Sequence, residues 1–318
     1  MSTPRRSMLL EPACDGAHVL IWGLAGASAA GSSVETALAE QLAEHELRGS
    51  RVPVVTLLSR GREDAEWIEQ AVPWLRLRGR RVIVRTRVVL PRSLVSVLAE
   101  AHSARPGSVI VELELAHPKP AIQRALLPSS ASSSTKGASR TAEPADTVAA
   151  LLLQAQHLET LELPVVARLA PLLPGIHDQP NGFAPLLRNL VAADLRDVIL
   201  EVGHLHPKQL RGLIAAQRDL TVAGLLELAR AYVVDPMVVL GGVEVPADSV
   251  QGVHKLKPRR AQVFAHGLEQ VARDHDGGAL RLPSCGCRAH CDLAGSSSTS
   301  GHDRPYESVM GRDLFASY

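Results

Sequence analysis

Aromatic residues are scarce in this chain of 318 residues, where Phe, Trp and Tyr together make up 3% of the sequence. So few rings leave little material for stacking on nucleobases. The net charge of +1 gives no general attraction to nucleic acid or to an anionic membrane. No run of about 18 apolar residues is present, which is the length that a transmembrane helix needs. We therefore expect no membrane association, and nucleic acid is not a favoured partner.

The N-terminal sequence MSTPRRSMLLEP also lacks the apolar stretch of a secretory signal. Cysteine is rare as well, with four residues in the whole chain, and a chain of this length does not depend on disulfides. These absences predict a cytoplasmic protein whose thiols are reduced.

Aliphatic residues are abundant, and hydrophobic residues in total make up 46% of the chain. Short apolar runs alternate with stretches of helical spacing, which predicts an α/β fold with a parallel sheet. The runs are residues 18–22, 52–58, 81–88, 108–115, 163–172 and 197–205. This pattern alone leaves open whether the strands form a six-unit partial barrel or a doubly wound sheet. In both folds, ligands bind at the carboxyl ends of the strands.

Composition also suggests boundaries along the chain. Residues 128–144 are rich in Ser, Thr, Gly and Pro without periodicity, which predicts a flexible insertion in the sheet domain. Residues 206–294 are expected to form a helical C-terminal extension, and residues 1–10 and 295–318 are expected to be tails. Pro73 predicts that the helix after the second strand bends or ends there.

The segment VVARLAPLLPGIHD, Val165–Asp178, resembles the fifth-strand segment of radical S-adenosylmethionine enzymes, where the pattern P-[LIV]-[LIV]-P-G-x-[NT]-D is common. Pro171, Pro174, Gly175 and Asp178 fit this pattern. The order of segments upstream is similar to the subfamily of spore photoproduct lyase and DNA-repair photolyase-like proteins. The resemblance covers roughly residues 11–205. It implies a (βα)6 partial barrel with a helical C-terminal extension, and S-adenosylmethionine as a candidate cofactor.

The same family holds a four-iron cluster with the motif C-x3-C-x2-C, which is followed by an aromatic residue. In this chain the matching positions are Cys14, His18 and Ile21, and Trp22 fits the aromatic position. Ile21 cannot ligate iron. The resemblance therefore implies a degenerate member, a pseudo-enzyme or partner subunit that kept the barrel and lost the radical chemistry. A second protein subunit is the partner that this hypothesis implies.

Three cysteines gather near the C-terminus, where Cys285, Cys287 and Cys291 form C-x-C-x3-C with His290 beside the last. Thiolates this close can converge on one soft metal, either zinc or an iron–sulfur cluster. Cys14, His290 or a partner's residue would complete the set. The alternative is three tail thiols without a ligand. We predict that any metal in the protein is bound here, near the open end of the barrel.

The loop after the first strand is rich in glycine, with Gly23, Gly26 and Gly31 ahead of a helical pattern. Loops of this kind expose backbone N–H groups to a phosphate. The phosphate-binding lysine of a P-loop is absent, and Ser32 or Ser33 also fits a plain helix cap. The alternative function is thus an active α/β enzyme that binds a nucleotide or another phosphate ligand at this loop.

Charged residues also occur inside the apolar strands, and buried charges need partners. Arg168 on the fifth strand is a candidate cofactor ligand, together with Glu114 and Glu201. The alternative is an ion-paired barrel interior in which these carboxylates, with Glu112, neutralise Arg85, Arg87 and Arg168.

Two further segments have both a functional and a structural interpretation. His204 and His206 follow the sixth strand as candidate acid–base or metal groups, or as solvated loop residues. The basic segment 253–262 is either a phosphate contact or a loop before a helix.

Overall fold

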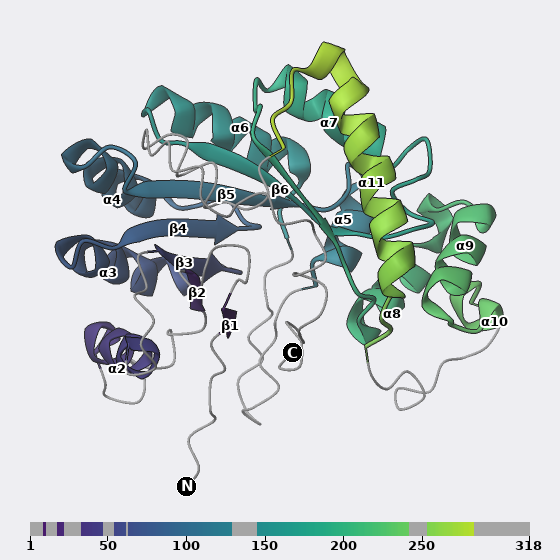
Figure 1. Ribbon diagram of the computed structural model, residues 1–318, viewed down its shortest axis with the longest axis horizontal. Helices are drawn as coiled ribbons and strands as arrows, with labels where there is room; N and C mark the ends of the chain where they lie inside the picture. Colours follow the sequence, from purple (N-terminus) through teal and green to yellow (C-terminus); the bar gives the residue numbers. More distant parts are fainter. Residues whose placement is uncertain are drawn as a thin grey trace, which may run out of the picture.

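A computed structural model describes residues 9–10, 18–21, 33–46, 54–61, 63–128, 145–241 and 253–282 (Figure 1). Its strands are β1 (Leu9–Leu10), β2 (His18–Ile21), β3 (Val54–Ser59), β4 (Arg81–Thr86), β5 (Val109–Leu115), β6 (Val165–Leu172) and β7 (Val198–Val202). Its α-helices are α2 (Val34–Glu46), α3 (Glu63–Leu77), α4 (Arg92–Ala104), α5 (Pro120–Leu126), α6 (Val148–Thr160), α7 (Phe183–Ala192), α8 (Pro207–Ala215), α9 (Val222–Tyr232), α10 (Pro236–Val239) and α11 (Pro258–Asp274).

The strands form one sheet in the order β1-β2-β3-β4-β5-β6-β7. Strands β2 to β7 pair with one another in parallel. Strand β1 pairs antiparallel with β2 and lies at the edge of the sheet. A doubly wound sheet reverses its strand order at a switch point, whereas these parallel strands follow one another without reversal. The fold is therefore the expected α/β partial barrel of six parallel strands with a helical extension, which confirms the fold class.

The helices that connect the strands cover one face of the sheet. Strand residues alternate between the two faces, and one set joins α2, α3, α4, α6 and α7 in the main hydrophobic core. Fully buried strand members of that core include Leu57, Val84, Val111, Leu113 and Leu169. Figure 1 shows these helices following the curve of the sheet on its outer side.

The opposite, inner face has a small apolar cluster at the amino-terminal half of the strands. It takes one residue from each of five consecutive strands, namely Val54, Ile83, Ile110, Val166 and Ile199. The register staggers these residues from strand to strand, as the tilt of strands in a barrel requires, because Ile83 lies opposite Ile110 whereas Val166 lies opposite Glu112. This layer is the apolar floor on which the candidate site is built.

The helical extension packs on the carboxyl ends of β5 to β7. A second hydrophobic core joins α5, α8 and α9 with residues at those strand ends, including Ala116, Leu173 and Leu205. The Tyr232 hydroxyl donates a hydrogen bond of 2.7 Å to the Gly203 carbonyl, which ties α9 to the residue after β7. The second core therefore covers this part of the mouth of the barrel.

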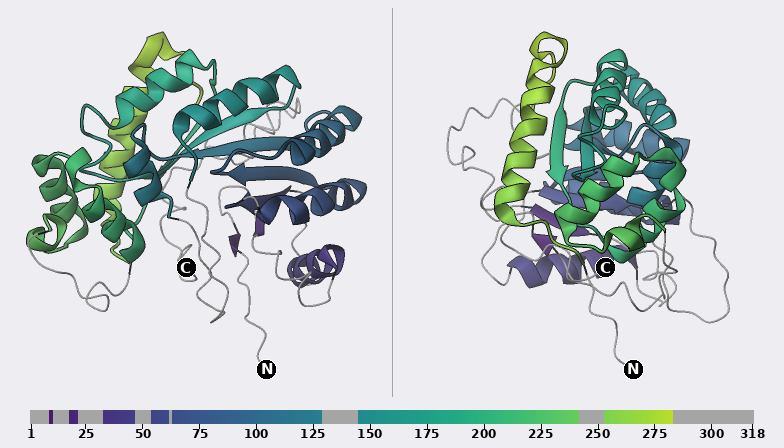
Figure 2. Two further views of the ribbon diagram at one scale, coloured as in Figure 1. Left: turned by 180° about the vertical axis from the view of Figure 1, so that it is seen from behind. Right: turned by 90° about the vertical axis from the view of Figure 1, so that its right-hand side faces the viewer.

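Helix α11 connects the two cores. Ala261 and Ala265 pack in the second core, whereas Leu268 and Ala272 pack in the main core. The helix contacts β7 and α7, and Figure 2 shows it standing along that side of the molecule. Beyond it, Arg281 lies beside Asp197 in a parallel bridge and binds its carboxylate at 2.6 Å. The outer edge of β7 is thus partly covered.

The sequence interpretation was wrong about Pro73 as an end point. Helix α3 continues through it to Leu77. Trp67, Ile68, Leu75 and the other buried side chains of α3 anchor both ends of the helix in the core, and this packing outweighs the hydrogen bond that proline cannot donate.

Helix α5 and the short strand β1 were not predicted. Of the predicted insertion, residues 128–144, all but Pro128 lie outside the described residues. No helix in the described ranges is long and apolar enough to cross a membrane.

Candidate functional site

The residues two positions after the apolar floor form a second, polar layer on the inner face. Each of the same five strands supplies one member, and the members are Thr56, Arg85, Glu112, Arg168 and Glu201. All but Glu201 expose less than a tenth of their surface. A layer of charged side chains on an apolar floor is costly unless its members pair or bind something.

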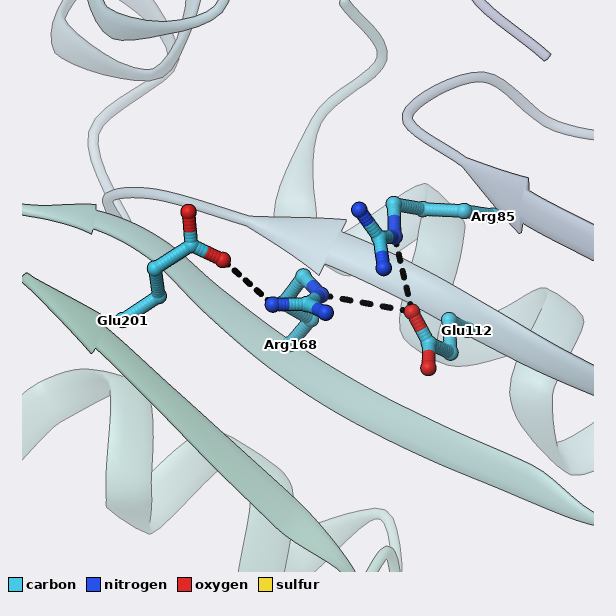
Figure 3. A network of polar contacts seen from close by, with 4 residues as sticks. All are labelled: Arg85, Glu112, Arg168 and Glu201. Atoms are coloured by element: carbon cyan, nitrogen blue, oxygen red, sulfur yellow. Dashed lines mark hydrogen bonds and ion pairs between the residues drawn. The ribbon is translucent and has the colours of Figure 1, made fainter. Parts of the chain in front are cut away.

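Four of these residues form a continuous chain of ion pairs across four strands (Figure 3). Arg85 Nε donates to Glu112 Oε2 at 2.8 Å, and Arg168 Nε donates to the same oxygen at 3.2 Å. Arg168 Nη1 also pairs with Glu201 Oε2. The register explains the arrangement, because Arg85 lies directly opposite Glu112 and Arg168 lies one step diagonally from it. The ion-paired interior considered from the sequence is therefore present, and its two middle members, Glu112 and Arg168, each pair with two residues.

Two oxygens of this polar layer have no hydrogen-bond partner within the described residues. One is Oε1 of Glu112, and the other is Oγ1 of Thr56 on β3. Both side chains are 0% exposed. Buried polar atoms are nearly always satisfied by protein, water or ligand, so each of these two needs an explanation.

A third layer follows, with Leu58, Arg87, Glu114, Ala170 and Gly203 at the corresponding positions. Glu114 is the candidate cofactor ligand of this layer, and it lies opposite Arg168 in the β5–β6 register. Burial raises the pKa of the Glu114 carboxyl above its ordinary value, and the charge of Glu201 adds to this. The guanidiniums of Arg87, Arg85 and Arg168 act against the rise without cancelling it.

Sequence reasoning missed a pair of buried histidines at the carboxyl ends of β5 and β6. The rings of His117 and His177 meet edge to face with centroids 6.0 Å apart. His177 accepts the Leu173 N–H at Nδ1 over 2.9 Å and donates from Nε2 to the Ala116 carbonyl over 2.6 Å. It therefore bridges the ends of the two strands. The only available signal was a histidine soon after each apolar run.

Both histidines are held neutral. Burial, followed by the neighbouring His177, lowers the pKa of His117 to about 3. Burial also lowers the pKa of His177. Since His117 Nδ1 accepts the Lys119 N–H at 3.0 Å and His177 Nδ1 accepts another backbone N–H, neither ring can gain a proton there without losing a hydrogen bond. These rings act as fixed structural links.

The segment on which the family resemblance rests has a structural role here. Asp178 Oδ1 accepts the Gly175 N–H at 2.8 Å and so closes the turn after β6. Gly175 has a φ of +83° and lies against the backbone of α9. The Pro171 peptide bond is cis, and Pro171 faces Gly203 across the sheet. Pro171, Gly175 and Asp178 of the pattern thus contribute to the turn or to its packing.

His204 and His206 follow β7, as expected. Burial lowers the pKa of His206, and the charge of His204 lowers it further. His206 is the N-cap residue of α8, and Gln209 accepts its N–H at 2.9 Å. The described part of the chain contains no group of three or more His, Cys, Asp or Glu residues that could hold a metal ion.

The third position that matches the iron–sulfur motif, Ile21, does not fit a cluster ligand. His18 and Ile21 begin and end strand β2, so they lie in the ladder with β3 instead of in a loop beyond the strand. The Ile21 side chain is 1% exposed and belongs to the main core between sheet and helices. It can neither ligate iron nor be replaced by a nearby ligand without opening that core.

Several sequence predictions fall outside the described residues and stay predictions. They concern the glycine loop with Gly23, Gly26 and Gly31, and the metal ligands Cys14, Cys285, Cys287, His290 and Cys291. Among the candidate cofactor ligands, the structure places Arg168, Glu114 and Glu201 together on the inner face.

No protein-family model matches the chain, and no curated protein matches its sequence. Among solved structures, the chain is weakly similar to SuiB of Streptococcus suis bound to S-adenosylmethionine, with a TM-score of 0.35 and 10% identity. The match covers 68% of this chain and 46% of SuiB, so the chain spans less than half of that protein. A likeness at this level carries no argument about cofactor or reaction.

Proposed function

We propose that this chain is a degenerate relative of the radical S-adenosylmethionine barrels, which serves as a binding protein or partner subunit and not as a radical enzyme. Two features support the relationship: six parallel strands in consecutive order, and the PLLPGIHD segment after β6. The claim that the radical chemistry is lost depends on the position of Ile21. Its side chain lies in the main core, where the third cluster thiolate would have to be.

The inner face supports the same proposal. Arg168, the residue best placed to hold a cofactor, is engaged on both sides by Glu112 and Glu201. A catalytic arginine that must exchange partners during a reaction would give up two buried ion pairs to do so, and buried pairs are costly to break. The network of ion pairs is consistent with a rigid polar surface on which a ligand binds.

Reconstitution with iron and sulfide without oxygen tests the loss of chemistry. The experiment should use a Cys285/Cys287/Cys291 triple serine variant next to the wild type, because the C-terminal thiols could take up iron on their own. We expect the triple serine variant to form no four-iron cluster, and neither protein to cleave S-adenosylmethionine reductively. A stable cluster in the variant, together with cleavage, would end the proposal.

A restored motif provides a sharper comparison. The double substitution His18→Cys and Ile21→Cys, in the triple serine background, recreates the thiolate spacing of the family with Cys14. Because position 21 faces the core and not the inner face, we expect this variant to remain without a cluster and to lose stability. Cluster assembly with wild-type stability would show that the strand can present these residues as ligands.

A further inference from the structure

The polar layer of the inner face contains two buried oxygens without a hydrogen-bond partner among the described residues: a carboxylate oxygen, which can only accept, and a hydroxyl, which can donate or accept. Glu112 Oε2 already accepts from two arginines, while Oε1 of the same carboxylate has no partner among the described residues. Thr56 Oγ1 also has no hydrogen-bond partner among the described residues. Thr56 and Glu112 belong to the two strands that flank Arg85: Glu112 lies directly opposite it, and Thr56 lies one step diagonally from it. A bare carboxylate oxygen in a buried position costs more than a neutral one.

The charges around these oxygens define what kind of donor can bind. In the described part of the inner face, the guanidiniums of Arg85, Arg87 and Arg168 meet the carboxylates of Glu112, Glu114 and Glu201. The raised pKa of Glu114 favours its neutral form, and each proton held there leaves an excess of positive charge. A cationic donor would be repelled by this excess, whereas a hydroxyl group would not.

We propose that the inner face of the barrel binds a small hydroxylated anion, a hydroxycarboxylate or a sugar phosphate. One ligand hydroxyl donates to Glu112 Oε1 and a second bonds to Thr56 Oγ1, while the anionic group faces the arginines. The inference rests on the proposed binding role of the barrel. It does not extend to S-adenosylmethionine, whose sulfonium and ammonium groups would meet the excess of guanidinium charge.

The floor beneath the layer is consistent with a ligand of limited size. Val54, Ile83, Ile110, Val166 and Ile199 close the inner face below Thr56 and Glu112. On the side of β6 and β7, Ala170 and Gly203 follow Arg168 and Glu201, and the Pro171 ring packs against Gly203, where a Cβ atom would lie 2.2 Å from the Pro171 Cβ. Arg87 and Glu114 occupy the corresponding positions above Arg85 and Glu112. A ligand that reaches the two oxygens would therefore lie between charged groups on β4 and β5 and the contact of Pro171 with Gly203 on β6 and β7.

Calorimetric titration with matched probes tests the inference on the full-length protein. Gluconate and glucose 6-phosphate carry both hydroxyls and charge, hexanoate carries charge alone, and glucose carries hydroxyls alone. We expect at least one of the first two to bind at millimolar concentration or below, and at least tenfold more tightly than hexanoate and glucose. The better of the two identifies the anionic group. Equal binding of all four probes, or binding of none, would overturn the inference.

Two substitutions on β3 locate the site. Thr56→Val keeps the shape of the side chain and removes the buried hydroxyl, so we expect unchanged or higher stability and binding weakened by about fivefold, a factor that corresponds to one typical hydrogen bond. Ser59→Ala is the control. Ser59 is also buried on β3 with an unpartnered hydroxyl, but it alternates to the opposite face. Equal effects of both substitutions on binding would contradict the assignment.

This test can fail independently of the proposed function. Absence of ligand binding together with absence of a reconstituted cluster leaves the pseudo-enzyme proposal intact and removes only the ligand class. Binding of S-adenosylmethionine in preference to both hydroxylated anions removes the ligand class and favours a retained cofactor site.

Discussion

Gly175 and Gly224 contact each other through their backbones. A Cβ atom on Gly175 would lie 2.3 Å from the Gly224 carbonyl oxygen, and a Cβ atom on Gly224 would lie 2.3 Å from the Gly175 carbonyl oxygen. The turn after β6 and helix α9 can approach this closely only because neither residue has a side chain. The helical extension is thereby positioned on the mouth of the barrel.

We expect Gly175→Ala or Gly224→Ala to lower the free energy of unfolding by about 2–3 kcal/mol, because backbone on both sides must shift to make room. Gly175→Ala adds strain at a φ of +83°. Gly267→Ala in α11 is the control, since a Cβ there meets nothing within 4 Å. It should raise stability by about 0.5–1 kcal/mol. Urea unfolding of the three variants measures these values, and a neutral Gly224→Ala would contradict the close contact.

This contact also shows where the sequence was informative and where it was not. The six parallel strands were predictable, because short continuous apolar runs are typical of strands that are buried on both faces. The motif around Gly175 was visible in the sequence, but the structural requirement for a glycine at this position was not. A positive φ and a contact with a helix about 50 residues away depend on tertiary packing, which a local pattern does not encode.

The candidate site was predictable only in part. As charged residues inside apolar strands, Arg168, Glu114 and Glu201 were candidates for a cofactor site or an ion-paired interior, but which carboxylate pairs with which arginine depends on the register between strands. The role of Glu112 as the shared acceptor of two arginines follows from that register. His117 was missed because a single histidine after a strand carries no spacing signal.

Glu112 should contribute far more to stability than Glu201. Removing the buried Glu112 carboxylate leaves Arg85 and Arg168 without their shared acceptor, and we expect Glu112→Ala to cost about 3–5 kcal/mol. Glu201→Ala should cost clearly less, because its side chain is 35% exposed and water can replace it. Chemical denaturation of both variants at one pH provides the comparison. Equal losses would mean that the shared acceptor is not the centre of the network.

His117 makes the protein sensitive to acid. Its pKa is near 6.5 in an unfolded chain but about 3 in the fold, so the unfolded state binds the proton first as the pH falls. Stability from this residue is fully present above pH 6.5 and is lost progressively as the pH falls toward 3. The slope is at most about 1.4 kcal/mol per pH unit.

We expect His117→Gln to have lower stability at neutral pH, because the bond from the Lys119 N–H is weakened, but a flatter decline through that window. The lowered pKa of His177 should leave part of the decline in place. Unfolding free energies measured at several pH values for wild type and variant give the two slopes. Parallel slopes would show that His117 titrates alike in both states.

The cysteine cluster near the C-terminus is open to a direct measurement. If Cys285, Cys287 and Cys291 hold a metal, protein purified without oxygen should contain zinc or iron in a fixed ratio, and the triple serine variant should contain none. A Cys14→Ser variant tests whether the fourth ligand comes from the N-terminal region. Equal metal in wild type and triple variant, or none in either, would leave these residues as ordinary thiols.

Val233 ends helix α9 in a conformation that suits glycine. Its φ of 56° and ψ of 45° lie in the left-handed region, and the residue is 78% exposed. Nothing in the described structure therefore compensates for the strain of a β-branched residue there. Val233→Gly should therefore raise the free energy of unfolding by about 1 kcal/mol, and Val233→Asn by less. Thermal unfolding of the two variants, measured at low and high protein concentration, checks the order.

The concentration series decides what an opposite result would mean. Val222 and Leu226 are exposed on the same face of α9 as Val233, at spacings of four and seven residues. If Val233→Gly destabilised the protein only at high concentration, the valine would contact a second copy of the chain through this face. A loss of stability at every concentration would instead place its contact within the same chain, and the strain argument at this helix end would be wrong.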